Sequence, residues 1–141
     1  MRLWLTTALA LLAAPLWAQS APQDLLDQAM LLGPARMENA GGQLTLFGEA
    51  GAMSYVAVAT GPDCGTTGSA CDEIRFQAVA PPAAASGDPV ADWQGADLGG
   101  ELSVGGDGWI VLTQSAELGD AAAAFQSWGG LMSAFQSRYG N

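Results

Sequence analysis

Two cysteines, Cys64 and Cys71, are the residues whose spacing most directly implies chemistry, since six residues separate them and the chain has no other cysteine. An even, closely spaced pair is typical of a disulfide in an exported protein. A zinc site would need two further ligands, and the chain has no histidine to supply them. A redox motif would have two intervening residues rather than six. We therefore expect a structural disulfide between Cys64 and Cys71.

Carboxylates are the remaining candidates for catalysis, because the chain lacks both histidine and lysine. Histidine-based triads, histidine acid–base catalysis and Schiff-base formation are therefore absent. The nearest clusters are Asp72 with Glu73 and Asp92 with Asp97, and such a pair could in principle serve a glycosidase. Asp63 could join the first cluster in a calcium site, although the spacing fits no EF-hand loop. Adjacent carboxylates more often form a solvated surface, so we expect no catalytic residue, no metal site and no cofactor.

The first 18 residues have the three parts of a secretory signal peptide. Arg2 supplies the positive charge, residues 5–14 form an apolar run, and Ala18 is the small residue before the expected cleavage site. The run is shorter than the roughly 20 apolar residues that span a bilayer. We expect cleavage after Ala18, a mature domain of residues 19–141 and a periplasmic or secreted location. A retained N-terminal anchor is the alternative.

The charge of the mature chain limits its partners. Removal of residues 1–18 from the 141 leaves 123, enough for one domain with one core. Arg2 leaves with the signal, so three arginines face 14 acidic residues and the net charge becomes −11. Nucleic-acid binding needs cations for the phosphates, and an anionic membrane surface would repel this chain. We expect neither partner after signal cleavage, and the acidic charge favours solubility.

A helix is the first element expected in the mature chain. It starts near Pro22, where proline suits the first turn, and ends at the Gly-Pro pair of residues 33–34. Its expected apolar face consists of Leu25, Leu26, Ala29, Met30 and Leu32.

Strands follow the helix. They are expected over residues 35–39, 43–47, 53–60 and 73–79, with glycine turns at residues 41–42 and 48–51. In the fourth strand Ile74, Phe76 and Ala78 lie on one face, and Arg75 and Gln77 on the other. Residues 61–71, between the third and fourth strands, are rich in glycine, proline and aspartate, so the disulfide is expected to tie the ends of a hairpin loop.

The second half begins with an exposed connector at residues 80–87. Asp88 and Pro89 could then open one helical turn in which Val90 and Trp93 point inward. Two more strands are expected at residues 100–104 and 109–117, joined by a Gly-Gly-Asp-Gly hairpin turn.

The last element is a long helix for which Asp120 is a good N-cap. Apolar side chains recur on one of its faces at steps of three and four: Phe125, Trp128, Met132, Phe135 and Tyr139. This stripe is either core or, as the alternative, a partner-binding surface. Gly129 and Gly130 each cost about 1 kcal/mol relative to alanine in an exposed helix, and we expect close approach of the helix to the sheet to explain them.

Several segments also carry a resemblance to a known family. They are residues 55–58 leading to Cys64, residues 71–78, the Val-Ala-Asp-Trp-Gln stretch at 90–94, and residues 109–112 followed by 125–135. Over residues 24–139 the chain resembles the YbjN-type domain, a bacterial family described as sensory-transduction regulators. The central helix is shorter than in that family, and Gln94 stands where asparagine is usual. The resemblance implies a fold similar to that of type III secretion chaperones and brings no catalytic residues with it.

Together these patterns predict an α+β domain. We expect a curved antiparallel sheet of about five to six strands with an N-terminal helix and a long C-terminal helix packed on it. The leading functional expectation is an exported, non-catalytic binding or chaperone-like module for a protein partner. A small-ligand binder or sensor in the periplasm is the first alternative, and a carboxylate-based hydrolase is the second.

Overall fold

The structure is a computed structural model that describes residues 21–40, 42–65, 71–82 and 87–140. The predicted signal peptide at residues 1–18 lies outside this part of the chain. The elements in chain order are α1 (Pro22–Leu32), β1 (Ala35–Ala40), β2 (Gln43–Ala50), β3 (Met53–Thr60), β4 (Glu73–Ala80), α2 (Pro89–Gly95), β5 (Glu101–Val104), β6 (Ile110–Glu117) and α3 (Ala121–Tyr139). This order confirms the predicted α+β fold.

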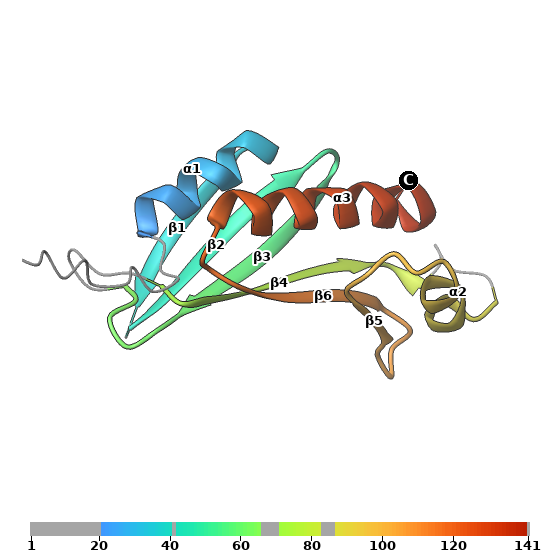
Figure 1. The fold of residues 1–141 in the computed structure, drawn as a ribbon. Helices are drawn as coiled ribbons and strands as arrows, with labels where there is room; N and C mark the ends of the chain where they lie inside the picture. The colour runs from blue at the N-terminus through green and yellow to red at the C-terminus, as the bar shows by residue number, and fades with distance from the viewer. Residues whose placement is uncertain (1–20, 41, 66–70, 83–86, 141) are drawn as a thin grey trace, which may run out of the picture.

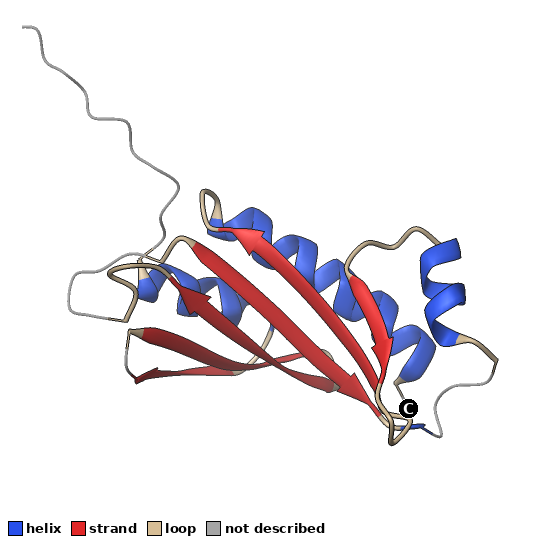
Figure 2. Ribbon diagram, turned by 90° about the horizontal axis from the view of Figure 1, so that it is seen from below, coloured by secondary structure: helices blue, strands red, loops and turns tan. Residues whose placement is uncertain are grey.

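All six strands form one open antiparallel sheet in the order β1-β2-β3-β4-β6-β5. The helices α1 and α3 lie together on one face of this sheet, and α2 lies at its far end beside β5 (Figure 1). Viewed from below, the strands lie in front of α1 and α3, and no helix of the described residues covers this second face (Figure 2). We call this second face the open face.

The core lies between the sheet and α3, where aromatic rings from both layers meet. Phe76 of β4 stacks on Trp128 of α3 at a centroid distance of 5.0 Å and an interplanar angle of 14°. Phe125 meets the same Phe76 edge-on at 5.1 Å. Alternation in β4 buries Ile74, Phe76 and Ala78 as predicted, because successive side chains in a strand point to opposite faces.

The predicted turn at residues 48–51 is wrong for its first three residues. Strand β2 continues through Gly48 to Ala50, and the turn begins at Gly51, whose φ of 64° favours glycine. Gly48 is buried and lies opposite Tyr55 in the ladder. It is therefore a site of close packing within a strand and not a site of chain reversal.

The connector prediction also needs one correction. Ala80 is the last residue of β4 and is fully buried, so the exposed part of the connector begins at Pro81. Residues 83–86 of this segment lie outside the described chain. The helical turn predicted after it is α2, which buries Trp93 and leaves Val90 half-buried.

Two predictions for the helices are wrong. Met30 was expected on the apolar face of α1, but its side chain is 58% exposed. Gly129 was expected to allow α3 to approach the sheet, whereas a Cβ atom there would lie 2.9 Å from Cδ2 of Leu32 in α1. No atom lies within 4 Å of the corresponding position on Gly130. Close helix–helix packing therefore accounts for Gly129, and nothing in the structure explains Gly130.

Candidate functional site

The aromatic stripe of α3 is part of the core. Its five predicted members are at most 7% exposed: Phe125, Trp128, Met132, Phe135 and Tyr139. Asp120 caps the helix as predicted, because its side chain accepts a hydrogen bond from the backbone N–H of Ala123. Phe135 packs between Trp93 and Tyr139 at centroid distances of 6.2 and 5.5 Å. The stripe therefore offers almost no accessible surface to a partner, and burial favours the core interpretation.

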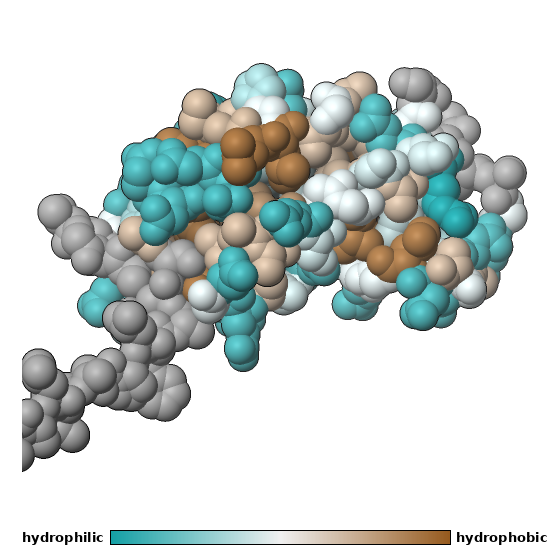
Figure 3. Space-filling model, turned by 45° about the horizontal axis from the view of Figure 1, so that its top comes forward, coloured by the Kyte–Doolittle hydropathy of each residue, from teal (hydrophilic) through white to brown (hydrophobic). Residues whose placement is uncertain are grey.

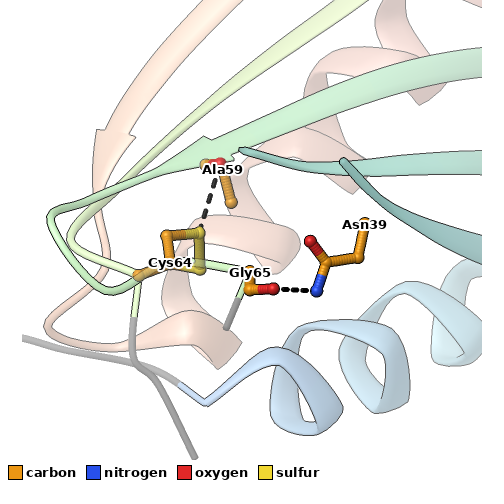
Figure 4. Close-up of a disulfide and its surroundings, with 5 residues drawn as sticks. Asn39, Ala59, Cys64 and Gly65 are labelled. Atoms are coloured by element: carbon orange, nitrogen blue, oxygen red, sulfur yellow. Dashed lines mark hydrogen bonds between the residues drawn. A yellow bond between two sulfur atoms is a disulfide. The ribbon is translucent and has the colours of Figure 1, made fainter. Parts of the chain in front are cut away.

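The disulfide between Cys64 and Cys71 is present, which confirms the predicted pairing. It closes the connection between β3 and β4, and both cysteines are fully buried. Sγ of Cys64 lies 3.2 Å from the carbonyl oxygen of Ala59 at the end of β3. The side-chain amide of Asn39 in β1 donates to the carbonyl oxygen of the adjacent Gly65 (Figure 4). This loop is fastened to two strands and is a structural feature.

The predicted carboxylate clusters do not form a metal site in the described part of the chain. Within residues 21–40, 42–65, 71–82 and 87–140, no three cysteine, aspartate or glutamate side chains gather where they could hold a metal ion. Asp72 uses its backbone to hold the sheet together, donating to Thr60 and accepting from Leu118. Asp92 and Asp97 are exposed at and after α2. Asp63 is exposed in the disulfide loop.

The open face of the sheet is an uncovered surface with apolar character. Its apolar side chains come from four neighbouring strands: Phe47, Val56, Val58, Val79 and Val111. Phe47 lies opposite Val56, and Val79 lies opposite Val111, so each pair faces its partner across neighbouring strands. Val56 is 38% exposed and Val79 is 46% exposed. We call these five residues the open-face stripe.

Two shallow hollows mark this stripe. The first has a volume of about 430 Å³ and lies between β1, β2 and β3, where Arg36, Phe47 and Val56 line it. The second has a volume of about 380 Å³ and is lined by Val56, Gln77 and Val79. Both hollows have Ser54, Tyr55 and Val56 of β3 in their walls, so they are neighbours on this face.

Charges surround the open-face stripe. Five glutamates lie on this face, Glu38, Glu49, Glu73, Glu101 and Glu117, against two arginines, Arg36 and Arg75. The guanidinium of Arg36 lies 4.2 Å from the centroid of the Phe47 ring and pairs with Glu38 of the same strand. The surface is therefore an apolar stripe within a predominantly acidic rim.

Other apolar areas occur elsewhere on the described surface. Met30 and Leu31 are exposed at the C-terminal end of α1, where Figure 3 shows a hydrophobic area. Val104 and Trp109, each 43% exposed, flank the β5–β6 turn. Each of these areas involves two side chains, whereas the open-face stripe spans four strands.

One sequence pattern indicates the apolar character of the open face, and it lies in β3. Residues 55–58 of β3 read Tyr-Val-Ala-Val, so this strand is apolar on both faces. A strand with one solvated face normally alternates with polar residues. The second apolar face of β3 was therefore visible in the sequence, but its alignment with Phe47, Val79 and Val111 depends on the register.

No helix in the described ranges is long and apolar enough to cross a membrane. Comparisons of the chain with protein-family models, with curated proteins and with solved structures find no match.

Proposed function

We propose that this protein is an exported, non-catalytic binding module that holds a segment of a partner protein on the open face of its sheet. The observation that carries the proposal is the open-face stripe, an apolar surface left uncovered by the helices. Contiguous exposed apolar surface marks interaction sites in many proteins. The YbjN-type resemblance points in the same direction by fold-level analogy.

The charge around the open-face stripe indicates what kind of partner would bind there. Five glutamates and two arginines give this face an acidic balance, and the whole chain carries a net charge of −10. Complementary charge raises the rate of association and the specificity of a complex. We therefore propose a partner segment that is apolar at its centre and flanked by lysine or arginine.

An oxidising compartment fits the chain. The buried Cys64–Cys71 disulfide is the kind of bond that persists outside the cytoplasm. The predicted signal peptide gives the route, and N-terminal sequencing of exported material is expected to begin at Gln19.

A small apolar ligand is the second candidate occupant of the same face. The hollow of about 430 Å³ is within the usual size range of ligand sites, and Arg36 and Ser54 could contribute polar contacts. It ranks second because ligand sites usually bury most of their ligand, whereas this hollow is an open depression.

Binding to unfolded apocytochrome c, a basic chain with apolar segments, tests the proposal. Val79→Glu places a charge in the open-face stripe and is expected to weaken binding about tenfold or more, a loss of about 1.4 kcal/mol. Val104→Glu is the matched control, because Val104 is similarly exposed (43% against 46%) but lies at the β5–β6 turn. Equal weakening by the two variants, or no binding by the parent protein, would contradict the proposal.

A further inference from the structure

The two edges of the sheet differ in how they are covered. At one end β5 has only four residues, and α2 packs beside it. At the other end β1 has six residues, and no further strand of the described chain pairs with its outer side. Edge strands present unpaired backbone groups that can pair with another chain. Strand β1 is therefore the edge at which pairing can continue.

The register of β1 against β2 shows which of its backbone groups point outward. The N–H of Glu49 donates to the carbonyl of Pro34 at 3.0 Å, so this facing pair is hydrogen-bonded. Such pairs alternate along an antiparallel ladder. Arg36 and Glu38 therefore direct their backbone groups toward β2, and Met37, between them, directs its N–H and C=O away from the sheet.

The side chains of β1 are self-complementary in charge. Arg36 and Glu38 lie two residues apart on the open face, and their side chains are 63% and 58% exposed. If a second β1 runs antiparallel to the first with Met37 facing Met37, then Arg36 of each copy lies opposite Glu38 of the other. In this register Met37 forms a hydrogen-bonded pair with its counterpart, as its outward backbone groups require.

We propose that a second copy of this chain binds along β1, antiparallel, with a two-fold axis at Met37. If the register shifts by one hydrogen-bonded pair, Met37 faces residue 35 or residue 39 of the second copy, and Arg36 then faces Arg36 or Ala40. Both reciprocal charge pairs are lost in either case. The charges thus select one register among those that the backbone permits. Such a dimer joins the two sheets into one, and the open faces of both copies lie on the same side. This inference does not depend on the proposed binding function.

Charge exchange tests the dimer, with the mass in solution measured by analytical ultracentrifugation. Arg36→Glu sets carboxylates opposite Glu38 of the second copy, and Glu38→Arg sets guanidinium groups opposite Arg36. Opposite charges that face each other across strands stabilise the pairing, and like charges destabilise it. Each variant is therefore expected to raise the dimer Kd about tenfold or more. An equimolar mixture of the two variants restores both charge pairs and is expected to form a heterodimer about as tight as the parent dimer.

Two further variants separate the interface from general effects on folding. Arg75→Glu makes the same charge change on the open face of the central strand β4 and is expected to leave the dimer Kd within about threefold of the parent value. Met37→Pro removes the outward N–H without removing a β1–β2 ladder bond and is expected to abolish dimerisation, whereas Met37→Ala retains the N–H and the dimer. A monomeric parent, no heterodimer in the mixture, or equal effects of Arg36→Glu and Arg75→Glu would overturn the proposal.

Discussion

Tyr55 covers Gly48 on the buried face of the sheet, where the two residues lie directly opposite each other in the β2–β3 ladder. A Cβ atom on Gly48 would lie 2.5 Å from both Cζ and Oη of Tyr55. The ring cannot retreat freely, because Trp128 and Phe76 pack against it at centroid distances of 5.8 and 6.3 Å. The absence of a side chain at Gly48 thus leaves the room that the Tyr55 ring occupies.

The substitution Gly48→Ala is expected to destabilise the protein by about 1–3 kcal/mol, the usual range for overpacking a well-filled core. Chemical denaturation of the variant and the parent measures this change. Tyr55→Val removes the ring and supplies the control background, in which Gly48→Ala should cost much less, since residues in contact couple energetically. Equal costs in the two backgrounds would show that the contact with Tyr55 is not the cause.

Burial also raises the pKa of Tyr55 to about 12 from its ordinary value of 10. The unfolded chain releases this proton near pH 10, and the folded chain retains it until near pH 12. The unfolded state therefore binds fewer protons in this interval, and stability falls as the pH rises through it. The total loss is roughly 2–3 kcal/mol, because one pKa unit corresponds to about 1.4 kcal/mol.

Tyr55→Phe isolates this contribution. The free energy of unfolding, measured between about pH 9 and pH 12, should decline less steeply in the variant than in the parent. Tyr139, whose pKa is also raised by burial, titrates in both proteins and cancels in the difference. Near pH 7 the variant should be at least as stable as the parent, because the buried hydroxyl of Tyr55 has no hydrogen-bond partner in the described part of the chain and its burial costs free energy. Parallel pH profiles would contradict the raised pKa.

Local patterns were sufficient to predict most elements of the fold. Alternation identified β4, and the Asp120 cap with the apolar periodicity behind it identified α3. The spacing of Cys64 and Cys71, between two alternating strands, predicted the disulfide. Each of these signals depends on residues that are close together in the chain.

The errors arose where a residue's role depends on a distant partner. The sequence around Gly48 is typical of a turn, and only the contact with Tyr55 across the ladder identifies Gly48 as a packing site. Gly129 accommodates Leu32, which lies almost a hundred residues earlier. The open-face stripe was not predicted for the same reason, since its residues come together only when four strands adopt their register. A single sequence does not contain these pairings explicitly.

The two adjacent glycines of α3 provide a matched pair of substitutions. Gly130→Ala is expected to stabilise the protein by roughly 0.5–1 kcal/mol, because alanine favours helix and open space surrounds the new methyl group. Gly129→Ala has the same helical advantage, but its methyl group would press on Leu32, so its gain should be smaller or absent. Thermal unfolding of the two variants beside the parent measures the difference. A Gly129→Ala protein as stable as Gly130→Ala would show that Leu32 moves aside without cost.

Reduction of the Cys64–Cys71 disulfide is expected to lower the free energy of unfolding by roughly 2–3 kcal/mol, since the bond limits the freedom of the unfolded chain across a short loop. Denaturation of the parent with and without a reductant measures the loss. The double variant Cys64→Ala/Cys71→Ala is the control, because its stability should not respond to the reductant. Both cysteines are fully buried, so the reduced parent should be more stable than this variant, which also loses the packing of two sulfur atoms. A parent whose stability is unchanged by full reduction would show that the Asn39–Gly65 hydrogen bond and the β3–β4 ladder hold the loop without the disulfide.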